Sequence, residues 1–300
     1  MQYASFDKVQ ALCRRLRLPD EAVHRALRYI RDGSAAVAAP FFHGLFSPQT
    51  AADSAKAIET LFFDETGAPK DSAFGVMAVF LAAALRTREM YDEIGIHSSV
   101  YDDTMGFFLC VLNDNLATTG APAFYGAAWW YHRQLSCQIF KLGVLEFEMT
   151  HLNEQNARIC GMPEGEPVLS VHIPSGAVMT RDALDESYRM ARKFFRTFYP
   201  GFNYRTFFCS TWLLAPALRG LLPAGSRILN FLSDYEILHS DEDNDGFAVR
   251  LFHTNEKITD YNLLPENTSL QRAAKKYLLQ GGKIGWTTGV IRLEDSVWRH

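Results

Sequence analysis

Two segments decide the fold, EPVLSVHIPSG at residues 166–176 and TFFCSTWLL at residues 206–214. Each contains an apolar run that predicts a buried strand, over Val168 to Ile173 in the first and over Thr206 to Leu213 in the second. Between the two strands, from near Thr180 to Pro200, apolar residues recur at helical spacing. The central part of the chain therefore reads as strand, helix, strand.

The helix between these strands has a well-defined apolar stripe. It consists of Leu184, Tyr188, Ala191, Phe195 and Phe198, with successive spacings of four, three, four and three. Pro200-Gly201 ends the helix. A second helical pattern follows Pro216 and includes Ile228, Phe231, Leu232 and Tyr235. Two strand-then-helix units thus lie next to each other in the sequence.

Further strands extend the predicted sheet on both sides of these units. Residues 140–149 alternate, with Glu146 and Glu148 on one face and Phe147 on the other. Later strands are expected at Phe247–Phe252 and Gly285–Arg292, with a helix at Ser269–Leu279 between them. Strands that alternate with helices predict an α/β (α+β) fold with a mixed sheet flanked by helices.

The first third of the chain reads as helical. Apolar periodicity predicts helices at 50–63, 71–90 and 98–115. The apolar pattern changes near Cys137, and the domain boundary is expected between Thr118 and Gln138. We therefore expect a helical N-terminal domain at 1–125 and a sheet-containing domain at 126–300.

Composition excludes several classes of protein. The net charge of the 300 residues is −4 and the basic residues are scattered, which argues against a nucleic-acid partner. The longest apolar run, residues 73–85, is too short to cross a membrane. The 5 cysteines lack CxxC spacing and the 9 histidines lack HExxH or HxH spacing, so we expect reduced thiols in a cytoplasm and no metal site. The acidic run 241–246 opens like a calcium loop, but Phe252 stands where its last ligand should be, which predicts a solvated turn.

Three groups of residues are candidates for chemistry. The loop 172–176 leads from a strand toward a helix and could hold a phosphate on its backbone amides, or could be an ordinary connection. Cys209 and His172 would lie near the same crevice if their strands are neighbours, which suggests a nucleophile, although a buried cysteine is usually a small apolar side chain. Glu146 or Glu148 could serve as a general base, or could belong to an exposed polar strand face.

The same residues resemble a known family. Residues 168–176, with Ser187, Ala191, 194–195 and 199–200, are similar to the GNAT-like C-terminal domain of bacterial acyltransferase-domain proteins. So are residues 208–214 with Pro216, 222–223, Ser226, Ile228 and Phe231, and the upstream segment 142–147. In that family a helical N-terminal domain comes first, which agrees with the pattern of residues 1–125.

The resemblance implies a fold, a reaction and a set of residues. Acyl-coenzyme A, the cosubstrate, would lie in a V-shaped gap between the strands Val168–Ile173 and Thr206–Leu213, and an amine would attack its thioester directly. The implied acceptor is a small-molecule or peptide amine, and a homodimer is a further possibility. The residues implied for binding the cosubstrate are Val171, His172, Ile173, Ser175, Gly176, Cys209 and Ser210. The family's usual Q/RxxGxG/A phosphate loop is absent, and only Ser175-Gly176 stands near its place.

Catalytic roles follow from the implied reaction. Glu146 or His172 is expected to act as base, and Ser210 or Tyr235 as donor to the leaving thiolate. Two alternatives stay open from the sequence. One is a GNAT-shaped module that binds a ligand or protein without catalysis, and the other is an acyl-enzyme formed by Cys209 with His172.

Overall fold

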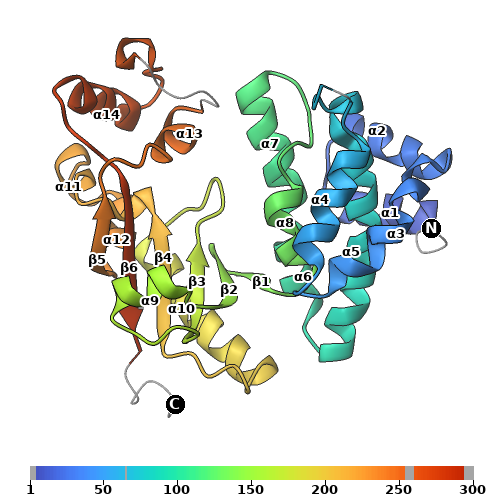
Figure 1. Ribbon diagram of the computed structural model, residues 1–300, viewed down its shortest axis with the longest axis horizontal. Helices are drawn as coiled ribbons and strands as arrows, with labels where there is room; N and C mark the ends of the chain where they lie inside the picture. Colours follow the sequence, from blue (N-terminus) through green and yellow to red (C-terminus); the bar gives the residue numbers. More distant parts are fainter. Residues whose placement is uncertain (1–4, 65, 254–259, 294–300) are drawn as a thin grey trace. The chain divides into compact units, whose positions relative to one another are not determined.

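The computed structural model describes residues 5–64, 66–253 and 260–293 (Figure 1). The chain divides into two compact units, residues 1–142 and residues 143–300. Helices make up nearly all of the first unit, and the second holds almost the whole sheet. This arrangement confirms the predicted fold class, a helical N-terminal region followed by a mixed sheet flanked by helices.

The first unit is built around one long buried helix, α5. Residues 74–84 of α5 are buried on every side, because their side chains are apolar or small at each position. The α-helices of the unit are α1 Phe6–Arg15, α2 Asp20–Arg31, α3 Ala39–Phe42, α4 Ala51–Leu61, α5 Phe74–Ile94, α6 Ser98–Met105, α7 Phe107–Thr119 and α8 Ala128–Leu135. Short 3-10 turns occur at η1 Ser34–Ala38, η2 His43–Phe46 and η3 Lys70–Ala73. Among the described residues, no helix has both the length and the apolar character needed to cross a bilayer.

The helix predicted at 98–115 is two helices rather than one. α6 ends at Met105 and α7 begins at Phe107, with Gly106 between them. A Cβ at Gly106 would lie 2.9 Å from the carbonyl oxygen of Asp103, so the join is tight enough to need a glycine. Apolar spacing alone does not detect such a change of direction.

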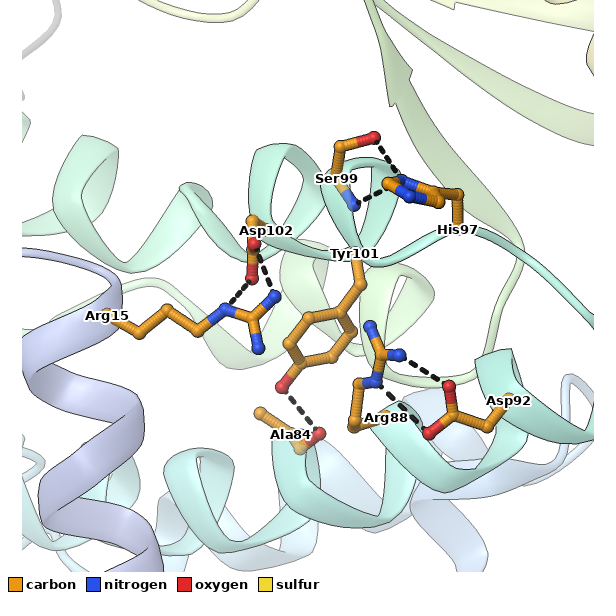
Figure 2. A network of polar contacts seen from close by, with 8 residues as sticks. All are labelled: Arg15, Ala84, Arg88, Asp92, His97, Ser99, Tyr101 and Asp102. Atoms are coloured by element: carbon orange, nitrogen blue, oxygen red, sulfur yellow. Dashed lines mark hydrogen bonds and ion pairs between the residues drawn. The ribbon is translucent and has the colours of Figure 1, made fainter.

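A polar network joins three helices of the first unit (Figure 2). Arg15 on α1 holds Asp102 on α6 through two contacts of 2.6 Å. The buried Tyr101 donates a hydrogen bond of 2.8 Å to the carbonyl of Ala84 on α5, and the guanidinium of Arg88 lies over its ring. Because the Arg15–Asp102 pair is partly exposed, its contribution is mainly to orientation rather than to stability.

The second unit alternates strands and helices. Its helices are α9 Glu154–Cys160, α10 Arg181–Phe198, α11 Leu218–Leu221, α12 Arg227–Ser233, α13 Phe247–Phe252 and α14 Ser269–Leu279, with 3-10 turns η4 Trp212–Leu214 and η5 Tyr261–Leu263. Its strands are β2 Leu145–His151, β3 Pro167–His172, β4 Thr206–Thr211, β5 Glu236–Asp241 and β6 Trp286–Arg292, and β1 Ile139–Leu142 closes the first unit. Their order in the sheet is β1-β2-β3-β4-β6-β5. β3 and β4 are parallel neighbours, and each is antiparallel to its other neighbour.

The sheet formed by β2 to β6 has two differently covered faces. On one, which we call the α10 face, Phe147 and Phe207 pack against Tyr188 of α10. On the other, which we call the α9 face, Val168 and Phe208 pack in a cluster with residues of α9. Side chains alternate between the two faces along each strand. The register of the strands therefore assigns each candidate residue to one face.

Two predicted elements are corrected by the structure. The single strand over 140–149 is a pair of strands, because the backbone turns at Gly143, whose φ is +72°. The strand expected at Phe247–Phe252 is the helix α13. Its buried residues are Phe247, Ala248, Leu251 and Phe252, which recur with helical rather than alternating spacing. The strands at 168–173, 206–213 and 285–292 and the helix Ser269–Leu279 are confirmed, with small changes at their ends.

Candidate functional site

The centre of the candidate site is a gap between β3 and β4. The two strands pair in parallel at only two positions, Leu169 with Phe207 and Ser170 with Phe208. Each strand is nevertheless paired over its whole length with its outer neighbour, β3 with β2 and β4 with β6. The carboxyl-terminal halves of β3 and β4 therefore diverge, and the gap begins after Ser170 on one side and after Phe208 on the other. Such a crevice at the carboxyl ends of parallel strands is a common place for a ligand.

A histidine and two carboxylates lie beside the gap on the α9 face. Glu146 is directly opposite His172 in the register of β2 and β3, and Glu148 is opposite Ser170. The Nε2 atom of His172 and Oε2 of Glu148 are 2.9 Å apart and make a part-buried hydrogen bond. Glu146 is 5% exposed. The three side chains form one cluster, which the sequence suggested only as separate candidates.

The other lip of the gap carries a hydroxyl cluster on the same face. Ser210 on β4 is exposed, and its Oγ lies 3.1 Å from Oγ1 of Thr288 on β6. Ser210 Oγ also accepts a hydrogen bond of 3.1 Å from the indole Nε1 of Trp286. Ser210 and His172 therefore lie on the same face, at the two edges of the gap.

Cys209 and Tyr235 lie on the opposite face, the α10 face. The register that pairs Ser170 with Phe208 places Cys209 on the face opposite to His172. Cys209 is fully buried, and burial raises the pKa of its thiol well above the ordinary value. A thiolate nucleophile needs a lowered pKa and a nearby base. The geometry therefore favours Cys209 as a wall of the gap and does not support a Cys209–His172 pair.

Tyr235 follows α12 and is also buried on the α10 face. Its neighbours include Tyr188 and Cys209, and burial raises the pKa of its phenol well above the ordinary value. The side chain of Tyr235 therefore stays protonated. Of the two donors expected from the sequence, Tyr235 and Ser210, each lies on a different face of the gap.

The loop that follows β3 leads into the amino terminus of α10. Ser175 and Gly176 are exposed, Gly176 has a φ of +80°, and the amide of Ala177 bonds to the carbonyl of Pro174. Thr180 is the N-cap of α10, and its side chain accepts from the amide of Ala183. α10 has 18 residues, so its amino terminus, at the end of the loop that leaves β3, presents amides and a positive dipole end.

Two features of this site were missed or undervalued in the sequence. Glu148 makes a hydrogen bond with His172, whereas the sequence pointed to Glu146 as the carboxylate base. Both glutamates occupy the same strand face, so only the side-chain conformation distinguishes them. Trp286 was expected only as part of a strand, and its indole binds Ser210. Within the described ranges, no group of three or more His, Cys, Asp and Glu side chains is arranged to hold a metal ion.

The fold and the gap define a class of protein, the GNAT-like acyltransferase domain. Residues 139–291 match the family of the GNAT-like C-terminal domain, and residues 7–137 match the family of the N-acyltransferase N-terminal domain. The chain therefore belongs to the family that joins these two domains. The resemblance inferred from the sequence is confirmed.

Solved structures of acyltransferases share the fold of nearly the whole chain. A complex with decanoyl-CoA is 22% identical, with a TM-score of 0.74 over 96% of this chain and 88% of that one. A complex with decanoyl-CoA and teicoplanin is 22% identical, with a TM-score of 0.73 over the same shares, 96% and 88%. A mutant acyltransferase in complex with octanoyl-CoA is 23% identical, with a TM-score of 0.75 over 96% and 88%. A comparison with curated proteins finds no match.

Proposed function

We propose that this chain is an N-acyltransferase that moves an acyl group from acyl-coenzyme A to the amine of a small molecule or peptide. The observation that carries the proposal is the gap, where β3 and β4 keep their outer partners and pair with each other at two positions only. Backbone groups along the two diverging edges can bind an extended ligand as a strand binds a neighbouring strand. The amide groups of the pantetheine arm are suited to this mode. Structural relatives that bind acyl-CoA support it.

The phosphate end of the cosubstrate would lie at the amino terminus of α10. Exposed Ser175 and Gly176 and the first amides of α10 supply backbone N–H donors, and the helix dipole favours an anion there. This arrangement needs no side chain from the family's usual phosphate loop, which the sequence lacks.

The acyl carbonyl would lie at the divergence point, near Val171 and Ile173. Backbone N–H groups on this part of β3 have no pairing with β4, because the register ends at Ser170 and Phe208. A fixed N–H directed at the developing oxyanion lowers the barrier, since it stabilises charge that exists mainly in the transition state. Cys209 would form the opposite wall of this part of the gap.

We assign the base to His172, oriented by Glu148. When the Nε2–H of a neutral imidazole donates to the Glu148 carboxylate, Nδ1 carries the lone pair that accepts the proton from the amine. The carboxylate also stabilises the imidazolium that forms. Glu146, opposite His172 in the ladder, is the second candidate for this role and could act through a water molecule.

We assign the proton donor for the leaving thiolate to Tyr235. The amine would enter from the α9 face, where His172 lies, and the sulfur would stay on the α10 face with the helix that holds the phosphates. Tyr235 is on that second face, whereas Ser210 is on the first and is engaged by Trp286 and Thr288. Ser210 would instead line the path of the acceptor.

We also propose four further properties of the chain. They are domains at residues 1–125 and 126–300, a cytoplasmic location, a bacterial origin and a homodimer. A small-molecule acceptor is supported by the relative that was crystallised with teicoplanin.

A binding and mass experiment tests the proposed function. Isothermal titration with coenzyme A, acetyl-CoA and decanoyl-CoA should give heat with about one site per chain, and incubation with acyl-CoA and an amine panel should release free thiol. Intact mass should show no acyl adduct on the protein, because Cys209 is buried on the face opposite His172. Absence of binding heat would support a module without catalysis. An adduct on Cys209 would support the acyl-enzyme.

A further inference from the structure

A pair of buried tyrosines lies behind the gap on the α10 face. Tyr188 projects from the middle of α10 onto the sheet and stacks on Phe207 at 5.6 Å between ring centroids. Tyr235 stands where the chain leaves α12 for β5. The two phenols interact with each other and with Cys209, the first residue of β4 beyond its pairing with β3. The two phenols therefore lie next to the part of the gap where the thioester sulfur is proposed to bind.

The hydroxyl groups of these tyrosines are unusual for a protein core. Tyr188 and Tyr235 are each 6% exposed, and their hydroxyl oxygens are buried. The two groups influence each other, yet neither makes a hydrogen bond of regular geometry within the described residues. A buried hydroxyl without a partner costs about 1–3 kcal/mol, and phenylalanine would fill the same space without that cost. Retained polar groups of this kind are candidates for function.

A wide-open surface cavity lies beside Tyr188. It has a volume of about 410 Å³ and is lined by Arg181, Asp185, Tyr188, Asp234 and Ile291. Arg181 holds Asp234 at 2.5 Å and Asp185 at 2.7 Å, which fixes the polar rim of the cavity. The space is large enough for several water molecules, and four of its five lining residues carry a polar or charged group. Tyr188 therefore lies between this solvent-open space and Tyr235, with Asp234 beside it.

A lone buried phenol would be a poor acid in this position. Burial raises the pKa of Tyr235 well above the ordinary value, because a tyrosinate there would lack solvation, and the neighbouring Tyr188, Cys209 and Asp234 act in the same direction. Donation to a thiolate would leave that unsolvated anion behind. This cost is avoided if a second hydroxyl group donates a proton to Tyr235 while Tyr235 gives up its own.

We propose that Tyr188 and Tyr235 form a two-hydroxyl relay, which carries a proton from water in the cavity to the departing thiolate of coenzyme A. The relay rests on the proposed function. As the carbon–sulfur bond breaks, the sulfur takes the proton of Tyr235, Tyr235 takes that of Tyr188, and Tyr188 takes one from a cavity water. The proton that His172 removes from the amine returns to solvent and balances the proton drawn from it.

A proton inventory on the single-turnover rate of acyl transfer tests the relay. The wild type should show a curved dependence on the fraction of D₂O, because more than one proton moves in the step. Tyr188→Phe should give a linear dependence and a rate roughly 100-fold lower, at the lower end of the usual acid–base contribution. A thioester of a thiol more acidic than coenzyme A should restore the variant, since such a thiolate leaves without a proton.

Tyr204→Phe provides the matched control. Tyr204 is buried and stacks on the same Phe207 ring at 6.0 Å, but it does not line the cavity. This variant should keep the wild-type rate and curvature, and Tyr188→Phe should melt at the same temperature as the wild type or higher. A wild-type rate and a curved inventory in Tyr188→Phe would overturn the relay alone. A wild type that transfers no acyl group would overturn the proposed function and the relay together.

Discussion

His172→Gln is expected to lower the rate of acyl transfer by roughly 100-fold or more, because it removes the group that takes the proton from the attacking amine. The expectation rests on the 2.9 Å hydrogen bond between His172 and Glu148 at the edge of the gap. Glu148→Gln keeps the shape of the partner and removes its charge, so a smaller loss, roughly tenfold, is expected there. Initial rates at saturating acyl-CoA and acceptor measure both effects on kcat.

His151→Gln is the control for this prediction. His151 lies on the same strand as Glu148, but it pairs with Pro167 at the far end of the β2–β3 ladder and is exposed. Its replacement should leave kcat unchanged. Binding of acyl-CoA to His172→Gln should stay close to that of the wild type, since the backbone forms the gap. Full activity in both His172→Gln and Glu148→Gln would remove the base assignment and leave Glu146 as the candidate.

Gly285→Ala is expected to destabilise the second unit by about 3 kcal/mol or more. Gly285 begins the turn into β6 with a φ of +72°, and a Cβ there would lie 2.4 Å from the carbonyl oxygen of Asp241 and 2.7 Å from Cα of Glu242. Both contacts are with backbone, which has little freedom to move. The left-handed conformation alone costs alanine about 1–2 kcal/mol, and the overlap adds to it.

Gly281→Ala separates the two contributions. Gly281 also has a positive φ, +83°, but a Cβ there would meet nothing within 4 Å. This variant should lose only about 1–2 kcal/mol, the cost of the backbone conformation. Urea unfolding of both variants and the wild type measures the difference, and the melting temperature serves if Gly285→Ala is obtained in small amounts. Equal losses in the two variants would mean that residues 241–242 and Gly285 do not pack as described.

Much of the fold could be predicted because its elements carry strong periodic patterns. The helix α10 was identified from its apolar stripe, and all of Leu184, Tyr188, Ala191 and Phe195 are buried. The strand β5 was missed because it is polar and lies at the edge of the sheet, where its side chains are exposed or half-buried. α13 was mistaken for a strand because six apolar-rich residues are too few to separate the two periodicities without counting which positions are buried.

Only part of the candidate site could be predicted from the sequence. Strand alternation placed Glu146 and Glu148 on one face, but the choice of Glu148 as partner of His172 depends on side-chain conformation. Spacing suggested that His172 and Cys209 approach the same crevice, and the register places them on opposite faces of it. The sequence identified Tyr188 only as one residue of the apolar stripe of α10. Periodicity predicts which side chains are buried, but it does not show whether a buried hydroxyl group has a hydrogen-bond partner.

A crystal structure with a non-hydrolysable acyl-CoA analogue tests the central claim most directly. The account predicts that the pantetheine arm lies between the diverging ends of β3 and β4, past Ser170 and Phe208, with its phosphates at the amino terminus of α10. The thioether sulfur should be nearer to Tyr235 than to Ser210. An analogue bound elsewhere on the chain, with the gap closed by side chains, would contradict the account.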